Sequence, residues 1–213
     1  MTGALATLLA YLLGSLSGSL LLGRLRGVDV RRHGSGNAGG TNAFRVLGAR
    51  FALGVVAVDV GKGALAAAAL PALAATLTGP PQLPPTGLAL LCGFAAVLGH
   101  CYPLYHGFRG GKGAGTFLGV LLVLMPAAAG LALLGWLAVL TTTGYVSLAT
   151  MVAALLLVPV GWALAPAADA SLWLGFAIPG ALLILWTHRA NIGRLRRGDE
   201  SRFDGARLFS RSR

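Results

Sequence analysis

Residues 116–165 read TFLGVLLVLMPAAAGLALLGWLAVLTTTGYVSLATMVAALLLVPVGWALA, and none of these side chains is charged. A helix needs about 20 apolar residues to cross the hydrocarbon core of a bilayer, so this stretch is too long for one crossing. Breakers divide it at Pro126, at 141–144 and at 159–166. The stretch therefore predicts a protein built from several membrane helices.

The composition of the whole chain indicates the same class. Of 213 residues, 56% are hydrophobic, and the mean hydropathy of +0.77 is far above that of an ordinary soluble domain. The 17 Lys and Arg outnumber the six Asp and Glu, and most charges lie between apolar runs. In a membrane protein this excess sets orientation and attracts anionic lipids or substrates, so nucleic acid is not an expected partner.

The positions of the charges predict the number of crossings. Basic residues gather in 24–50, 105–115 and 188–213. The positive-inside rule places all three segments in the cytoplasm, which requires an even number of crossings between 115 and 188. We expect an all-α polytopic membrane protein with the N-terminus outside, the C-terminus cytoplasmic and a single domain over 1–213. The seven predicted helices are 4–23, 51–75, 86–104, 113–126, 127–142, 145–165 and 171–187.

Two charged residues lie inside the second predicted helix. Asp59 and Lys62 are three residues apart and so share one helical face. Charged side chains at that depth usually pair with each other or face a functional site. Both interpretations stay open from the sequence.

A glycine-rich basic loop, GFRGGKGAG, spans residues 107–115. It is not a nucleotide-binding P-loop, because Gly113 rather than Ser or Thr follows Lys112. Glycine frees backbone N–H groups, and with a lysine at a helix start they form a site for phosphate. The alternative is a flexible loop on lipid head groups. The candidate phosphate-binding residues of this loop are Gly110, Gly111, Lys112, Gly113 and Thr116.

A second polar loop, HGSGNAGGTNAFR, spans residues 33–45. Its hydrogen-bond donors on a tightly turning backbone suit an oxyanion or a phosphate. They are Ser35, Asn37, Thr41, Asn42 and Arg45. The segment also suits a turn in which Thr41 or Asn42 caps the following helix, with Arg45 about one turn into it. The two roles are compatible.

A third cluster, HRANIGRLRRGDE, spans residues 188–200. His188 and Asn191 share a helical face, and we interpret Arg196 and Arg197 as lipid anchors.

The chain has no His-x4-Asp dyad, no G-x-S-x-G elbow and no cluster of metal ligands. Cys92 and Cys101 fit no metal or redox spacing. We therefore expect no metal, and a substrate that is already activated.

Three segments together closely resemble the signature loops of the PlsY family, the bacterial acyl-phosphate:glycerol-3-phosphate acyltransferases. They are GSGNAGGTNAFRVLG (34–48), HCYPLYHGFRGGKGAGTFLG (100–119) and HRANIGRLRRGDE (188–200). The resemblance extends to GSLSGSLLLGRLRGVDVR (14–31) and DVGKG (59–63), and so covers the chain in order. Gly40 stands where alanine is common and Ala114-Gly115 where Val-Ala is common, which removes no donor.

The resemblance implies transfer of a fatty acyl group from acyl phosphate to the 1-hydroxyl of sn-glycerol 3-phosphate. The products would be lysophosphatidic acid and inorganic phosphate, in the first step of phospholipid synthesis. It implies a multi-pass enzyme of the bacterial inner membrane with a cytoplasmic active site and no cofactor. Its partners would be the two substrates, membrane lipid and, through a functional link, an enzyme that produces acyl phosphate.

The resemblance and the residue types together suggest roles for individual residues. The predicted catalytic residues are Ser35, Arg45, His188 and Asn191. The predicted substrate-binding and phosphate-binding residues are Asn37, Thr41, Asn42, Gly110, Gly111, Lys112, Gly113, Thr116 and Glu200. Supporting roles fall to Asp59, Lys62 and His100.

Our hypothesis is that the Lys112 loop holds glycerol 3-phosphate, while Ser35, Asn42 and Arg45 hold acyl phosphate. The proton acceptor is either a substrate phosphate or His188. A transporter or a CDP-alcohol phosphotransferase is the alternative class. The first needs an internal repeat and the second an acidic metal cluster, and the sequence has neither.

Overall fold

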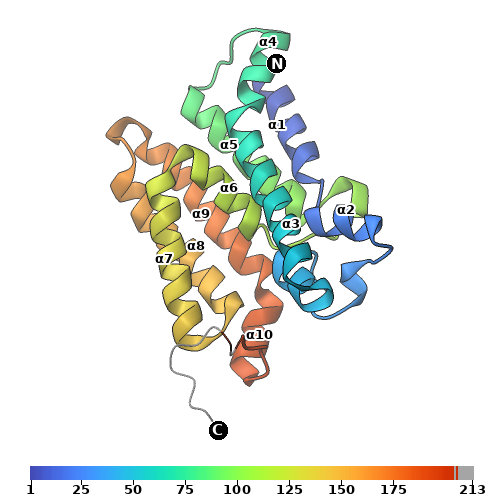
Figure 1. The fold of residues 1–213 in the computed structure, drawn as a ribbon. Coiled ribbons are helices and arrows are strands. Elements are labelled where there is room, and N and C mark those ends of the chain that lie inside the picture. Colours follow the sequence, from blue (N-terminus) through green and yellow to red (C-terminus); the bar gives the residue numbers. More distant parts are fainter. Residues whose placement is uncertain (204, 206–213) are drawn as a thin grey trace. The chain divides into compact units, whose positions relative to one another are not determined.

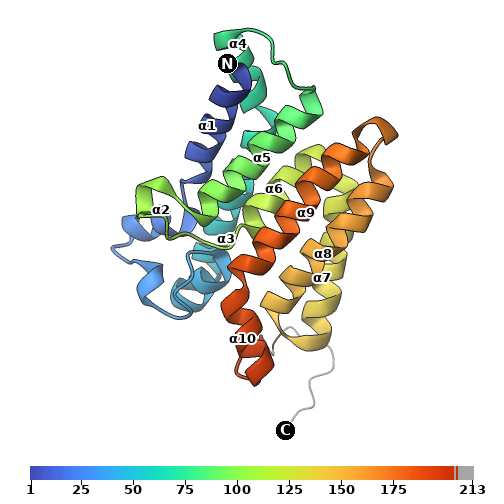
Figure 2. The same cartoon turned by 180° about the vertical axis from the view of Figure 1, so that it is seen from behind.

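A computed structural model describes residues 1–203 and 205 of the chain. Every regular element in that part is a helix, as Figure 1 and, from behind, Figure 2 show. The helices divide into two compact units, Met1–Leu124 and Met125–Arg213. The all-α class expected from the sequence is confirmed.

The first unit begins with a broken helix and ends with a short one. The apolar segment predicted at 4–23 forms two helices inclined by 46°, joined at residues 15–17. The elements of this unit are α1 (Thr2–Gly14), α2 (Gly18–Leu25), the 3-10 turn η1 (Val30–Arg32), α3 (Gly40–Ala68), α4 (Leu70–Thr78), α5 (Pro85–Cys101), the 3-10 turn η2 (Leu104–His106) and α6 (Ala114–Leu124).

Helix α3 begins earlier than the sequence predicts. Its N-cap is Gly39, with no side-chain capping bond, so capping by Thr41 or Asn42 was wrong. A kink at Gly48, where φ is 80°, lets the chain continue from this first part into the apolar part of the helix. The left-handed region costs glycine little. Arg45 consequently lies within the first two turns of α3, as expected.

Glycines bring the helices of the first unit into close contact. A Cβ on Gly63 of α3 would overlap the backbone of Thr116 in α6, and one on Gly119 of α6 would overlap the carbonyl of Val60. Small residues at such crossings let membrane helices approach closely and gain van der Waals contact. This packing holds the start of α6, where the Gly–Lys loop ends, against the middle of α3.

The second unit is built from three long helices and a short basic one. Gly144 ends α7 in the left-handed conformation and allows the chain to reverse into α8. Trp136 Nε1 donates to Thr150 Oγ1 at 3.1 Å between those two helices. The elements are α7 (Pro126–Thr143), α8 (Val146–Leu164), the 3-10 turn η3 (Ala167–Asp169), α9 (Ala170–Thr187) and α10 (Arg189–Arg197).

Five helices within the described residues are long and apolar enough to cross a membrane, and the bent pair α1–α2 makes a sixth. The five include α3, α5 and α7–α9. α6 has 11 residues and spans only about 16 Å at 1.5 Å per residue. The prediction of an integral membrane protein is therefore confirmed, whereas the seventh crossing and the orientation of the termini stay predictions.

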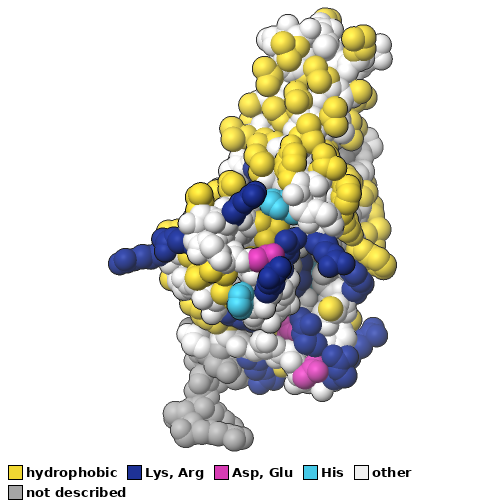
Figure 3. All heavy atoms as spheres, turned by 90° about the vertical axis from the view of Figure 1, so that its right-hand side faces the viewer, with side chains coloured by type: hydrophobic (Ala, Val, Ile, Leu, Met, Phe, Trp, Pro, Cys, Tyr) yellow, Lys and Arg dark blue, Asp and Glu magenta, His cyan; other side chains and the backbone are white. Residues whose placement is uncertain are grey.

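The surface has the polarity that a bilayer requires. On the face drawn in Figure 3, Lys and Arg side chains gather in one region, and hydrophobic side chains cover much of the rest. Large apolar side chains such as Leu53 (72% exposed) face outward from the helices, which suits contact with lipid. The exposed arginines of the first unit are Arg24, Arg26, Arg32, Arg45, Arg50 and Arg109.

Candidate active site

The first polar loop is organised by one buried amide. Asn42 is only 1% exposed, and its Nδ2 donates to the carbonyls of Val30 at 2.8 Å and His33 at 3.1 Å. Its Oδ1 accepts from the N–H of Ser35 at 2.8 Å. Both amide hydrogens of Asn42 are thus used to shape the loop. The structure supports a holding role for Asn42, and its predicted contact with a substrate stays a prediction.

The same loop presents other polar groups at the surface. Ser35, Thr41 and Arg45 are exposed, and Asn37 is half-buried. Gly34 and Gly36 have φ values of 58° and 72°, which turn the chain tightly around Ser35. The first N–H groups of α3 follow directly, and a helix N-terminus favours an anion. The structure thus gathers a hydroxyl, a guanidinium and a helix start in one loop of the first unit.

The Gly–Lys loop, residues 107–113, is fastened to the end of α5. The N–H of Gly110 donates to the carbonyl of Cys101 at 3.2 Å, and that of Gly111 donates to the carbonyl of His100 at 3.1 Å. A Cβ on Gly111 would also overlap Nε2 of His100. These two amides hold the loop, so their predicted binding of phosphate stays a prediction. Lys112 follows at once, close to the N-terminus of α6, where the helix dipole favours anions.

Thr116 lies in the first turn of α6 and is fully buried. Its Oγ1 is the one buried side-chain nitrogen or oxygen without a hydrogen-bond partner in the described part of the chain. The predicted role of Thr116 in phosphate binding is untested by this geometry.

A charged cluster is buried inside the first unit. Lys62 Nζ lies 3.0 Å from Asp59 Oδ1, 2.8 Å from His100 Nδ1 and 3.0 Å from the carbonyl oxygen of Leu16. Because an ammonium group only donates, its three hydrogens have three acceptors. Asp59 Oδ1 also accepts from the N–H of Gly18 at 3.0 Å. Asp59 and Lys62 thus form an ion pair that His100 joins, and the predicted supporting role of the three residues at the site stays a prediction.

In the second unit, Glu200 collects three donors. Its Oε1 accepts from Asn191 Nδ2 at 2.6 Å and Ser147 Oγ at 2.7 Å, and its Oε2 accepts from Arg194 Nε at 2.7 Å. Burial by itself would raise the pKa of Glu200, but the three hydrogen bonds outweigh it and hold the pKa below its ordinary value. A carboxylate committed in this way is poorly suited to bind phosphate, so the structure supports a role in orienting Asn191.

His188 lies one helical turn before Asn191 and is 4% exposed. Its Nδ1 is 2.8 Å from the carbonyl oxygen of Ile184, which can only accept, so Nδ1 carries the hydrogen. The other ring nitrogen, Nε2, is then the basic one in the neutral ring.

Ser147 was not identified as a site residue from the sequence. The one feature of the sequence that could have indicated it is a polar residue close to the break at Gly144.

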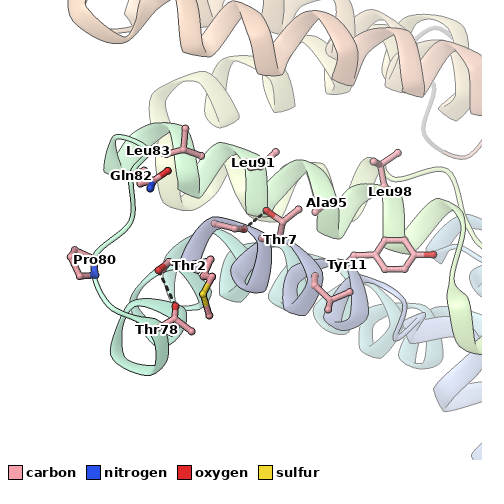
Figure 4. A pocket seen from close by; sticks show the side chains of 14 residues that line it. Thr2, Thr7, Tyr11, Thr78, Pro80, Gln82, Leu83, Leu91, Ala95 and Leu98 are labelled. Carbon is pink, nitrogen blue, oxygen red and sulfur yellow. Dashed lines mark hydrogen bonds between the residues drawn. The ribbon is translucent and has the colours of Figure 1, made fainter.

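A pocket of about 980 Å³ lies between α1, α5 and the connection that precedes α5 (Figure 4). Its lining is mostly apolar, and Thr78 Oγ1 donates to Thr2 Oγ1 at its edge at 2.9 Å. None of the predicted site residues lines this pocket.

The described residues contain no group of three His, Cys, Asp or Glu side chains that could hold a metal.

These features define a helical integral-membrane protein whose glycine-rich basic loops suit phosphate-bearing substrates. Residues 4–198 match the family described as glycerol-3-phosphate acyltransferase. The chain belongs to this family, the PlsY family of the sequence analysis, and is a glycerol-3-phosphate acyltransferase. Membership removes the transporter and the CDP-alcohol phosphotransferase as alternatives.

Relatives and solved structures agree along nearly the whole chain. The glycerol-3-phosphate acyltransferase of Halalkalibacterium halodurans is 41% identical, with 94% of this chain and 95% of the relative covered. That of Myxococcus xanthus is 45% identical, with 95% and 100% covered. The crystal structure of PlsY (YgiH), an integral membrane glycerol 3-phosphate acyltransferase, in its glycerol 3-phosphate form has a TM-score of 0.81 at 36% identity, covering 95% of this chain and 96% of that one. Its lysophosphatidic acid form has a TM-score of 0.79 at 35% identity, covering 95% of each.

Replacing Lys62 by methionine should destabilise the first unit, because the Asp59 carboxylate then loses its nearest counter-charge, which lies 3.0 Å away. Breaking one side of a buried ion pair costs about 3–5 kcal/mol. Thermal unfolding in detergent would measure it. Asp59→Leu combined with Lys62→Met should recover most of the loss, and Arg50→Met, at an exposed arginine of the same helix, is the control. Equal melting temperatures for Lys62→Met and Arg50→Met would contradict the prediction.

Replacing Glu200 by glutamine should lower stability by about 1–3 kcal/mol, because an amide cannot satisfy the three donors. The lowered pKa of Glu200 sets the pH dependence. The ionised Glu200 side chain contributes its full stabilisation of the folded state above pH 4.5, the ordinary pKa of a glutamate. This stabilisation is lost as the pH falls through the lower pKa that Glu200 has in the folded protein. Melting curves between neutral pH and pH 3 should therefore show a smaller acid-induced loss in Glu200→Gln than in the wild type.

The matched control is Asp199→Asn, whose carboxylate is 55% exposed and contacts the exposed Arg197. Exposed ion pairs contribute little, so its melting temperature should stay close to the wild-type value. If both variants melt alike at neutral pH, Glu200 does not hold this cluster together.

Proposed function

We propose that this enzyme uses acyl phosphate as donor and transfers its acyl group to the 1-hydroxyl of sn-glycerol 3-phosphate. Lysophosphatidic acid and inorganic phosphate are the products, at the first step of phospholipid synthesis. The observation that carries the proposal is the pair of basic loops in the first unit, which run into the N-termini of α3 and α6. A reaction between two phosphate-bearing substrates needs two such anion sites.

The donor follows from the resemblance and from the available chemistry. Acyl phosphate is a mixed anhydride, so the glycerol hydroxyl oxygen can attack its carbonyl carbon directly. The bond between that carbon and the phosphate oxygen then breaks, and phosphate leaves with the electron pair. No covalent acyl-enzyme is required, which fits a chain with no nucleophile elbow and six acidic residues in all. The glycerol 3-phosphate and lysophosphatidic acid forms of the similar crystal structures support the acceptor and the product.

In this proposal each of the two loops binds one of the two substrates. Lys112, Gly113 and the start of α6 bind the phosphate of glycerol 3-phosphate, and Gly110 and Gly111 hold that loop in place. Ser35, Thr41 and Arg45, with Asn37 beside them, bind acyl phosphate and stabilise the tetrahedral oxyanion. Asn42 shapes their loop, as its three hydrogen bonds indicate.

The second unit supplies the remaining predicted residues. His188 accepts the hydroxyl proton at Nε2, because Nδ1 donates to a backbone carbonyl. Asn191, oriented by Glu200, offers an amide to the substrates. A phosphate oxygen of the substrate is the competing proton acceptor, and the two are separated by the variant described below.

We also propose the membrane arrangement expected from the sequence. The broken pair α1–α2, α6 with its flanking residues and the five long helices would make seven crossings, with the N-terminus outside and the C-terminus cytoplasmic. The basic segments around 24–50, 105–115 and 188–213 support this orientation. The active site would then face the cytoplasm of a bacterial inner membrane, where an acyl-phosphate-producing enzyme can deliver the donor.

Phosphate release from palmitoyl phosphate by the purified enzyme in mild detergent tests the donor. Release should require glycerol 3-phosphate, and acyl-CoA should not replace acyl phosphate. Arg45→Ala should lower kcat by about 100-fold or more, because a preorganised donor to the oxyanion is lost. Arg50→Ala, with an exposed side chain on the same helix, should keep wild-type activity. Turnover with acyl-CoA and none with acyl phosphate would refute the proposed donor.

His188→Gln tests the proton acceptor. If Nε2 of His188 takes the hydroxyl proton, kcat should fall by about 100-fold or more, because general base catalysis of this kind contributes at least that much. Arg189→Gln is the neighbouring control, since its guanidinium lies over the Trp186 ring at the surface. A His188→Gln enzyme that keeps most of its kcat would assign the proton to a substrate phosphate.

A further inference from the structure

The side chain of Arg31, just before the first polar loop, contacts the start of the Gly–Lys loop. Arg31 belongs to η1, and its Nη1 donates to the carbonyl oxygens of His106 at 3.1 Å and Arg109 at 3.2 Å. These carbonyls flank the left-handed residues Gly107 and Phe108 at the start of the Gly–Lys loop. One guanidinium group therefore restrains the point at which this loop leaves η2.

Asp29 fixes the guanidinium in that position. Its Oδ1 accepts from Nε of Arg31 at 3.0 Å and its Oδ2 accepts from Nη2 at 2.9 Å, a bidentate geometry that holds the planar group in one orientation. The Oδ1 atom also accepts from the backbone N–H of Arg31 at 3.0 Å. The hydrogen bonds from Arg31 hold the pKa of Asp29 at about 2, so the carboxylate stays charged at any physiological pH.

The two loops meet at a second point. A Cβ built on Gly111 would lie 2.6 Å from the carbonyl oxygen of Ala38, so the backbones of the loops approach closely there. Lys112 is the next residue. The Gly–Lys loop is therefore restrained on both sides of Gly110, by hydrogen bonds from Arg31 of η1 at one end and by close packing against Ala38 of the first polar loop at the other.

A glycine-rich loop loses much conformational entropy when it becomes ordered around a ligand. Contacts that order it beforehand reduce this cost, and the gain appears as affinity for the ligand. Arg31 uses four of its five N–H donors on Asp29 and two backbone carbonyls, so most of its hydrogen-bonding capacity holds the loop.

We propose that Arg31, oriented by Asp29, is a positioning residue that preorganises the Gly–Lys loop for glycerol 3-phosphate. The inference rests on the proposed binding of glycerol 3-phosphate by that loop. It adds a role for two residues outside the predicted catalytic and binding sets.

Steady-state kinetics of Arg31→Gln give the first test. The KM for glycerol 3-phosphate should rise about tenfold, while kcat and the KM for acyl phosphate stay near the wild-type values, because binding rather than transition-state stabilisation is weakened. Arg31→Lys should show a smaller rise, since an ammonium keeps the charge and can still donate to Asp29 but lacks the planar fork that pairs with both carboxylate oxygens. Arg32→Gln is the matched control, because Arg32 is exposed and its side chain makes no hydrogen bond in the described part of the chain. An unchanged KM in Arg31→Gln, or an equal rise in Arg32→Gln, would overturn the proposal.

A double-mutant cycle tests whether Asp29 acts through Arg31. Asp29→Asn should raise the same KM in the wild-type background and add little in the Arg31→Gln background. Independent, additive effects would overturn the pairing.

Hydrogen–deuterium exchange of the substrate-free enzyme separates this inference from the proposed function. Peptides that cover 106–113 should exchange faster in Arg31→Gln than in Arg32→Gln, while peptides from α7–α9 stay unchanged. This difference tests the restraint even if the wild type does not turn over acyl phosphate, a result that would refute the proposed donor alone. Equal exchange in both variants would refute the restraint.

Discussion

The buried cluster of Asp59, Lys62 and His100 is the interaction on which the first unit depends. Each of the three is 3% exposed, and charges removed from water remain stable only when every polar atom has a partner. Those partners come from α3, from α5, from the carbonyl of Leu16 in the break between α1 and α2, and from the N–H of Gly18 at the start of α2. The break thus supplies a backbone acceptor for Lys62. The carbonyl of His100 also accepts from Gly111, which connects the cluster to the Gly–Lys loop.

Much of the fold could be predicted because membrane helices follow length and breakers. Pro126 begins α7, Gly144 ends it, and α9 begins one residue from its predicted start at 171. The beginning of α3 could not be predicted in this way. Its first part, before the kink at Gly48, carries Arg45 and lacks an apolar pattern, whereas the apolar part follows the kink, close to the predicted start at 51. Hydropathy therefore locates the apolar part of the helix and not the polar turns that precede it.

The predicted site residues are located by their types, but their roles depend on partners that are distant in sequence. Asn42 was expected among the phosphate donors, yet its amide forms hydrogen bonds with Val30 of η1 and with His33 and Ser35 of its own loop. Ser147 and Glu200 are 53 residues apart and form one hydrogen bond. Neither composition nor spacing reveals such a pairing, because it follows from the way α8 and the segment after α10 pack.

The acidic residues explain why an activated donor suits this chain. Asp29 holds Arg31, Asp59 holds Lys62, and Glu200 holds Arg194 with Asn191. Each of these carboxylates organises a cation or an amide, and a carboxylate in that role is a poor general base because its hydrogen bonds stabilise the charged form. With these three carboxylates in organising roles, the elements around them contribute mainly positive charge and oriented donors. Such groups lower the barrier for a substrate that carries its own good leaving group, as a mixed anhydride with phosphate does.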